Sequence, residues 1–314
     1  MSESKREQVM LALPSLILEV RQPSDLLKKI LLSVVLSLGI ALLSVAPLLA
    51  LEFPAVSPFP ESEYGMGLGS LLTLLFYLSL VIGTTFLIVF LLKMGKFNVL
   101  NIILIGTLSF AAGSIASVFI PVWSSFIVSF IGIELPSVFW YSLLWGSFGI
   151  FFLLFTLLML KPKFRRARNG VMLLIGAWVG SFMSLLGELT PLVLMGGFAL
   201  YDVFSVFKGP LGEMVKELQK GRSEGAEREE AGNDGEEIML GLGDIVFYGI
   251  AASYAYRLSF IGFIAVVFTL LVGLSLTLYF LVKGLRKGDR SALPALPLPI
   301  FLSLAVIIVF KFLL

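Results

Sequence analysis

Residues 137–160 read SVFWYSLLWGSFGIFFLLFTLLML and contain no charged side chain. At a rise of about 1.5 Å per residue, a helix of this length crosses the roughly 30 Å hydrocarbon core of a bilayer. A helix that is apolar on every side is buried either in a large protein core or in a membrane. The stretch therefore predicts a transmembrane helix, and it sets the pattern for the rest of the chain.

The composition of the whole chain agrees with this pattern. Of its 314 residues, 58% are hydrophobic and only 14% are charged, which is too little charge for a soluble domain. The net charge of +2 is too small to indicate a nucleic-acid partner. We predict an all-α polytopic membrane protein with nine transmembrane helices, near residues 30–50, 67–92, 97–120, 137–160, 170–187, 189–207, 238–256, 259–282 and 296–314.

The basic residues are distributed unevenly over the loops between these spans. Of the 23 lysines and arginines, 21 fall on one side, and only Arg257 and Lys311 fall on the other. Because basic residues gather on the cytoplasmic side, the N-terminus is predicted to be cytoplasmic and the C-terminus outside. Arg257 and Glu188 are expected to be interfacial anchors. The outer loops carry acidic residues instead, at Glu52, Glu61, Glu63, Glu134 and Glu188.

Two segments outside the predicted spans help to divide the chain into five parts. Residues 9–18 are apolar but too short to span, which suggests an interfacial segment. The polar stretch after the sixth span is rich in Gly and Glu and is expected to be a mobile loop, with a short amphipathic helix at 211–220. The parts are a cytoplasmic or interfacial segment 1–29, five scaffold helices in 30–187, the sixth span 188–207, the loop 208–237 and the last three spans 238–314.

The chain contains no cysteine and no histidine. Disulfides, thiolate nucleophiles and every histidine-dependent metal site or catalytic pair are thereby excluded. Any acid–base chemistry must rest on Asp, Glu, Lys or Tyr. We expect neither a metal ion nor a cofactor.

Two aspartates, Asp202 and Asp244, lie in stretches that otherwise resemble lipid-buried helix. A carboxylate at membrane depth costs roughly 2.5–3.5 kcal/mol, so it marks a functional site by default. Asp202 lies six residues before Lys208 and Asp244 seven residues after Glu237. At helical rise, both are expected roughly 9–10 Å inside the cytoplasmic boundary of consecutive antiparallel helices. They are therefore predicted to face each other.

Two adjacent carboxyl groups are expected to share one proton at intermediate pH, which provides a base and an acid together. The ionised group can activate a water molecule, and the protonated group can donate to an amide carbonyl; the sequence does not decide which aspartate plays which part. Glycines beside the aspartates would leave room for water and a peptide, or would serve ordinary helix packing. They are Gly196, Gly197, Gly241 and Gly243.

A third element begins the last predicted span, where Pro294-Ala295-Leu296 is followed by Pro297 and Pro299. Prolines at this density are expected to hold the backbone extended. Extended backbone at membrane depth must be buried in protein or line a water-filled cavity. The segment is predicted to offer carbonyl groups to an extended substrate. The alternative is a proline-rich loop that simply ends at the last helix.

Three short motifs occur in order on the sixth, seventh and ninth predicted spans: Tyr201-Asp202, Gly241-Leu242-Gly243-Asp244 and Pro294-Ala295-Leu296. This arrangement resembles the presenilin and signal-peptide-peptidase family of intramembrane aspartyl proteases, and especially its prokaryotic, archaeal-type members. The resemblance implies that Asp202 and Asp244 are the catalytic dyad. It further implies substrate-binding roles for Tyr201, Gly241, Leu242, Gly243, Pro294, Ala295 and Leu296.

The same resemblance implies a multi-pass protein of the cell membrane that works within the lipid bilayer. Its substrates would be transmembrane proteins or remnant signal peptides, most readily those with the N-terminus outside, and no obligatory partner subunit is expected. The loop 208–237 corresponds to the region where presenilins are cut, but it lacks a hydrophobic plug, so self-cleavage is not expected.

Three other functions compete with proteolysis. Buried carboxylates also serve ion-coupled or proton-coupled membrane transporters. Prepilin-type peptidases use a Gly-x-Gly-Asp motif too, but lack a Pro-Ala-Leu element on a ninth span. A structural scaffold would not require two carboxylates at one depth. The proline-rich element and the absence of an internal repeat favour the protease over the transporter.

Overall fold

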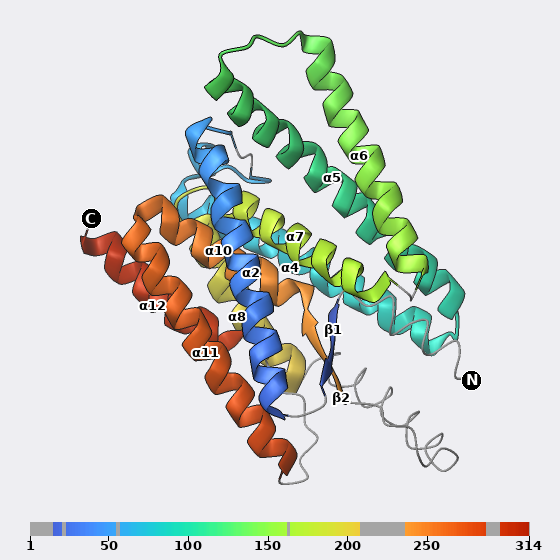
Figure 1. Cartoon of the computed structure of the whole chain (residues 1–314). Helices are drawn as coiled ribbons and strands as arrows, with labels where there is room; N and C mark the ends of the chain where they lie inside the picture. The colour runs from blue at the N-terminus through green and yellow to red at the C-terminus, as the bar shows by residue number, and fades with distance from the viewer. Residues whose placement is uncertain are drawn as a thin grey trace.

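The computed structural model describes residues 15–20, 23–54, 57–161, 164–207, 236–286 and 296–313 (Figure 1). Most of these residues are helical. The long helices are α2 (Pro23–Ala50), α4 (Met66–Lys93), α5 (Phe97–Ile131), α6 (Ser137–Leu160), α7 (Arg165–Met183), α8 (Thr190–Phe207), α10 (Leu242–Leu258), α11 (Phe260–Arg286) and α12 (Pro297–Leu313). The short helix α3 (Glu61–Tyr64) precedes α4, and the strands β1 (Ser15–Val20) and β2 (Glu236–Gly241) form a small sheet.

Each predicted span overlaps one of the long helices. Among the described residues, α2, α4, α5, α6 and α11 contain stretches long and apolar enough to cross a membrane. Helices α8 and α12 are apolar but shorter. The helical, membrane-spanning class is therefore confirmed for the bulk of the chain, whereas the count of nine spans and the orientation of the termini stay predictions.

Helix α5 is longer than the sequence suggests. The expected end at residue 120 is wrong, because the helix continues through Pro121 to Ile131. Membrane helices tolerate an internal proline where neighbouring groups satisfy the backbone that it frees. The expectation fails because it applies a rule from soluble helices.

The small sheet is not expected from the sequence either. Strand β1 pairs antiparallel with β2, with Ser15 opposite Gly241 and Val20 opposite Glu236. The interfacial segment expected at 9–18 thus overlaps β1, and residues 1–14 lie outside the described part of the chain. The seventh span does not begin at residue 238, because β2 runs to Gly241 and α10 starts one residue later.

Helix α10 is the centre of the bundle and packs against α2, α7, α8, α11 and α12 (Figure 1). From Tyr248 to Ala255 every residue is buried. Several of these residues are small, which allows neighbouring helices to approach on all sides. A helix enclosed by protein does not need the uniform apolar surface of a lipid-facing helix, so α10 is less hydrophobic than its neighbours α8, α11 and α12.

Helices α7 and α10 cross closely at Gly180 and Gly249. A Cβ atom on Gly180 would lie 2.5 Å from the Val246 carbonyl oxygen and 2.8 Å from the Gly249 Cα atom. Nearby, the Ser181 hydroxyl lies 3.2 Å from that of Ser253. The glycine is therefore required by the distance between the two backbones.

This crossing gives a prediction about stability. Gly180→Ala is expected to lower the free energy of unfolding by about 1–3 kcal/mol, because the added methyl group forces the two helices apart. Gly170→Ala, on the same helix with nothing within 4 Å of the added atom, is the matched control and should be neutral or slightly stabilising. Thermal unfolding in detergent measures both; equal effects would contradict the close crossing.

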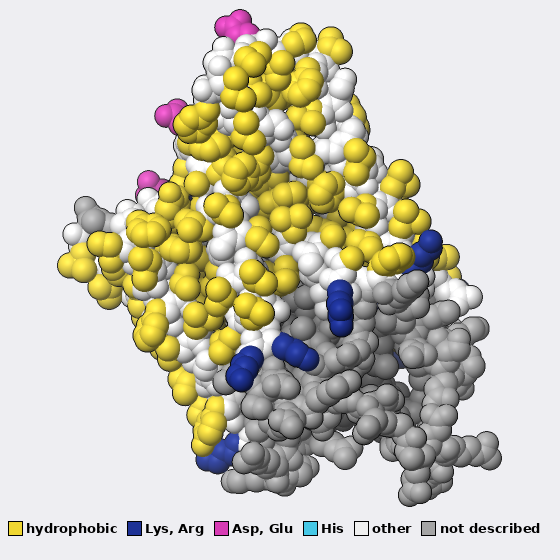
Figure 2. Space-filling view, viewed as in Figure 1, with side chains coloured by type: hydrophobic (Ala, Val, Ile, Leu, Met, Phe, Trp, Pro, Cys, Tyr) yellow, Lys and Arg dark blue, Asp and Glu magenta, His cyan; other side chains and the backbone are white. Residues whose placement is uncertain are grey.

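The outer surface is strongly apolar. Phe130, Trp145 and Ile150 on α5 and α6 are each more than 60% exposed. Figure 2 shows hydrophobic side chains over most of one face, with Lys and Arg along one margin and Asp and Glu at the opposite end. A monomer in water rarely exposes so large an apolar patch, so this surface is suited to lipid.

Candidate active site

Asp202 lies in the last part of α8, five residues before the helix ends at Phe207. Its side chain is half-buried. The Leu296 backbone N–H donates a hydrogen bond to Asp202 Oδ2 at 3.2 Å. This hydrogen bond links the Tyr201-Asp202 motif directly to the Pro294-Ala295-Leu296 motif, across 94 residues of chain.

Asp244 lies in the first turn of α10, immediately after β2. Gly241 is the N-cap of the helix, with φ −64° and ψ 138°, and its backbone N–H donates back to the Asp244 carboxylate. A carboxylate at the third helical position that reaches back to the N-cap amide is the second half of a capping box. The local sequence therefore fixes both the start of α10 and the direction of the Asp244 side chain.

The depth of Asp244 below the cytoplasmic boundary is expected from the sequence to be roughly 9–10 Å. That value assumes helical rise from residue 238, but residues 236–241 form a strand, which rises about 3.3 Å per residue. The path from Glu237 to Asp244 is therefore longer than a helix would make it. Equal depth of the two aspartates therefore stays a prediction, although the charge of Asp202 does act on Asp244.

The two carboxylates are electrostatic neighbours: the charge of Asp202 acts on Asp244. Both charges also act on the Tyr248 hydroxyl. Tyr248 lies one turn after Asp244 on α10 and is fully buried. This tyrosine is not among the site residues predicted from the sequence, although residues four apart share a helix face and the spacing from Asp244 is visible there.

Leu296 is buried, and α12 begins at the next residue, Pro297. The expectation that Pro297 and Pro299 hold the backbone extended is wrong, because both lie in the first turn of α12. Amide groups of a first turn have no partner within the helix, so proline is tolerated there. The segment also presents a donor to Asp202, through Leu296, in addition to the carbonyl groups that we expect.

The four glycines near the aspartates differ in their surroundings. A Cβ atom on Gly241 would lie 3.1 Å from Asp244 Oδ2, and one on Gly243 would meet nothing within 4 Å. Gly197 lies against the flexible side chain of Leu74 on α4, whereas a Cβ atom on Gly196 would make only an ordinary contact at 3.9 Å. Gly197 therefore serves helix packing, whereas a role of Gly196 and Gly243 in leaving room for a substrate stays a prediction.

Tyr201 and Leu242 both lie close to an aspartate in sequence. Tyr201 is half-buried, with its ring 6.4 Å from that of Phe198. The Phe198 ring in turn lies 4.9 Å from that of Phe247, which joins α8 to α10. Leu242 packs against the apolar cluster of α5, α6 and α7. In this structure Leu242 therefore supports the start of α10.

Several predicted features lie outside the described residues. Pro294 and Ala295 are two of them. The others are the amphipathic helix expected at 211–220 and most of the loop expected at 208–237. Their substrate-binding and regulatory roles stay predictions.

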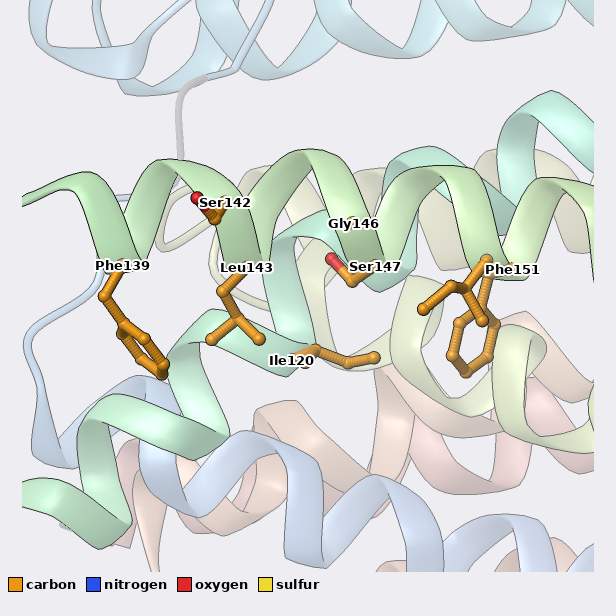
Figure 3. A pocket seen from close by; sticks show the side chains of 8 residues that line it. Ile120, Phe139, Ser142, Leu143, Gly146, Ser147 and Phe151 are labelled. Carbon is orange, nitrogen blue, oxygen red and sulfur yellow. The ribbon is translucent and has the colours of Figure 1, made fainter.

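A pocket of about 380 Å³ lies away from the aspartates, between α5 and α6 (Figure 3). Ile120 of α5 faces Phe139 and Leu143 of α6 across it, and polar side chains are contributed by Ser142 and Ser147. The lining holds no acid or base that could support hydrolysis.

The last third of the chain matches a known protein family. The family model described as Presenilin matches residues 213–314, which include Asp244 and Leu296 but not Asp202. No curated protein sequence matches the chain.

Two solved structures share the fold over nearly the whole chain. One is described as a presenilin family intramembrane aspartate protease in space group C222, with a TM-score of 0.56 and 19% identity over 92% of this chain and 99% of that one. The other is the same kind of protease in space group P2, with a TM-score of 0.56 and 21% identity over 90% and 96% of the two chains. The last third of the chain is thus similar to the Presenilin family model, and nearly the whole chain shares its fold with these two solved presenilin family structures.

Proposed function

We propose that this chain is an intramembrane aspartyl endopeptidase that hydrolyses peptide bonds of transmembrane segments. The observation that supports the proposal is the electrostatic influence of Asp202 of α8 on Asp244 of α10, together with the hydrogen bond from the Leu296 amide to Asp202. A buried pair of this kind is costly, and a chain without histidine or cysteine has few other groups for acid–base catalysis. Similarity to the Presenilin family model over residues 213–314, and the fold shared with two presenilin family intramembrane aspartate proteases, support the same interpretation.

In the proposed reaction, Asp202 and Asp244 share one proton. The ionised carboxylate takes a proton from water as the water oxygen attacks the scissile carbonyl carbon, and the protonated carboxyl group gives its proton to the carbonyl oxygen. The C–N bond of the resulting gem-diol then breaks. The amine leaves with a proton from one carboxyl group, while the other, now ionised, carboxylate takes a proton from a gem-diol hydroxyl, which becomes the carbonyl oxygen of the new carboxyl terminus. The pair ends the cycle with one proton, as it began.

Leu296 is proposed to orient the dyad. Its N–H occupies one oxygen of Asp202, which leaves the other oxygen available for water or for Asp244. Fixed donors of this kind act without reorganisation during the reaction. Tyr201, Gly241, Leu242, Gly243, Pro294 and Ala295 are proposed to shape the path of the substrate.

The substrates are proposed to be transmembrane proteins or remnant signal peptides, most readily transmembrane segments with the N-terminus outside, cleaved in the cell membrane by the single chain. The predicted cytoplasmic N-terminus of the enzyme resembles the topology of the presenilin branch, and this resemblance supports the proposed orientation of the substrate. Because no obligatory partner subunit is expected, the single chain reconstituted in liposomes should be sufficient for activity.

The direct test is the purified chain in liposomes with a fluorescent single-span substrate, assayed in parallel for cleavage and for proton or cation flux. We expect cleavage that is blocked by an aspartyl-protease transition-state analogue, without substrate-coupled flux. Coupled flux that survives the analogue, with no cleavage, would establish the transporter instead.

A further inference from the structure

The helices that carry the candidate site are tied together at their far ends. We propose that side chains around the turn between α7 and α8 form a clasp that positions the aspartates from a distance. The clasp consists of Glu61, Tyr254, Arg257 and Lys311. Its effect on catalysis rests on the function proposed above, but its effect on helix position does not.

Glu61 of α3 binds the amide groups at the start of α8. Its Oε1 accepts from the Thr190 backbone N–H at 2.7 Å, from the Thr190 hydroxyl at 2.6 Å and from the Leu189 N–H at 3.0 Å. Its Oε2 accepts from the Glu188 N–H at 3.1 Å, and Ser70 donates to Oε1 at 2.9 Å. The first amide groups of a helix have no partner within it, so a carboxylate from another segment supplies the cap of α8.

Arg257 and Tyr254 bind the carbonyl groups of the same turn. Arg257 Nη1 donates to the Ser184 carbonyl at 2.5 Å and to the Gly187 carbonyl at 3.0 Å. The Tyr254 hydroxyl donates to the Glu188 carbonyl at 2.6 Å. The Arg257 guanidinium also lies 5.4 Å from the centre of the Tyr254 ring, which adds a cation–π contact.

The charges of the clasp match the poles of the two helices. Ser184 is the C-cap of α7, so Arg257 places a positive group at the negative end of that helix. Glu61 places a negative group at the positive end of α8. Burial raises the pKa of Glu61, but its hydrogen bonds with Thr190, Ser70 and Glu188 outweigh burial and hold the pKa below its ordinary value. The carboxylate is therefore ionised at neutral pH.

The clasp reaches all three helices that meet at the candidate site. Lys311 of α12 lies with its Nζ 3.5 Å from the Tyr254 hydroxyl, so α12 joins α8 and α10. Asp202 lies twelve residues after Thr190, Asp244 thirteen before Arg257, and Leu296 fifteen before Lys311. At about 1.5 Å per residue, these spacings correspond to roughly 18–22 Å in each helix.

These contacts explain two residues that are exceptions in the sequence. Arg257 and Lys311 are the basic residues on the side of the predicted topology that otherwise lacks them. Arg257 is half-buried and donates to backbone carbonyls, which an interfacial anchor would not need to do. The placement of Arg257 and Lys311 is explained if catalysis depends on the relative position of α8, α10 and α12. A displacement of about 1 Å at a catalytic site can cost about 100-fold in rate.

Glu61→Ala is the main test, and Glu63→Ala on the same short helix is its matched control, because Glu63 is exposed. Glu61→Ala is expected to lower kcat about 10- to 100-fold with little change in KM. Glu61→Gln keeps a carbonyl oxygen for most of the donors and should recover much of this loss. Gly187→Ala should reproduce the loss of kcat while Glu61 itself is kept. The added Cβ would lie 2.6 Å from Glu61 Oε1 and push this carboxylate away, and the φ of 146° at residue 187 strains any side chain there.

The second readout is the distance between α8 and α12, which does not depend on activity. The chain has no native cysteine, so spin labels can be attached at Phe204→Cys and Phe301→Cys, both exposed. Glu61→Ala and Gly187→Ala should shift or broaden the distance distribution, whereas Glu63→Ala should match the wild type. An unchanged distribution together with unchanged kcat, or a loss of thermal stability alone, would overturn the clasp as a positioning device. Wild-type protein that cleaves nothing would refute the protease and leave this distance test decisive for the clasp.

Discussion

Replacing Asp202 or Asp244 by asparagine is expected to lower the rate of substrate cleavage by on the order of 10⁴-fold or more, since removing one member of a catalytic group disables the whole. Asparagine has nearly the same shape as aspartate but cannot accept or deliver the proton. The double variant should be about as inactive as either single variant, because the two groups act as a unit. Initial rates of cleavage in liposomes measure all three.

The same variants should fold normally. In Asp202→Asn the side-chain amide oxygen would still accept from the Leu296 N–H, and in Asp244→Asn it would still accept from the Gly241 N–H. Asparagine at either position also places a neutral amide beside the remaining carboxyl group, so no charge repulsion is added and thermal stability should be unchanged or higher. Glu63→Gln, which changes an exposed carboxylate on α3, is the control for charge removal and should retain full activity. Full activity in either Asp variant would refute the dyad.

Replacing Leu296 by proline is expected to reduce cleavage about 10- to 100-fold more than replacing it by alanine. Both variants lose a side chain that is only 4% exposed, but only proline also removes the N–H that binds Asp202. A hydrogen bond to a charged group is worth about 1.5–3 kcal/mol, and each 1.4 kcal/mol corresponds to about a factor of ten in rate.

The comparison separates orientation of Asp202 from packing of α12. Leu296→Ala should be destabilised because it leaves a cavity, and its thermal unfolding sets the baseline for Leu296→Pro. Equal rates in the two variants, after correction for the folded fraction, would show that the N–H has no part in catalysis.

The helices are largely predictable because a helix that crosses lipid needs a long, uninterrupted apolar run, which is visible in the sequence. In α6, Pro136 and Lys161 flank an uninterrupted apolar run, and the predicted and observed bounds agree. At α5 the sequence suggests an end at Pro121, but the tolerance of a proline depends on what surrounds it in space. Local sequence does not carry that information.

The sheet and the start of α12 escape prediction for a related reason. A short apolar run such as Ile238-Met239-Leu240 suits a strand or a helix, and its partner, β1, lies more than 200 residues away. Pro297 and Pro299 resemble helix breakers, although a first turn has no internal amide bonds to lose. Both errors concern groups whose hydrogen-bonding partners are not visible in the sequence.

The candidate site is predictable in its residues but not in its contacts. Asp202 and Asp244 stand out in the sequence because a carboxylate is costly in a membrane, and in the structure the charge of Asp202 acts on Asp244. The Leu296 contact is made by a backbone amide, which every residue except proline has, so its side chain gives no signal. The clasp joins Glu61 of α3 and Arg257 of α10 through backbone groups of one turn, and Lys311 of α12 through the Tyr254 hydroxyl. Only the fold brings these groups together.

The central claim is tested most directly by mass spectrometry of the products formed from a single-span peptide in liposomes. Wild-type protein is predicted to cut the peptide within its apolar segment and to yield two fragments whose masses add one water molecule. Asp244→Asn should yield neither fragment. Cleavage confined to the flanking polar residues, or the same fragments from Asp244→Asn, would contradict the account.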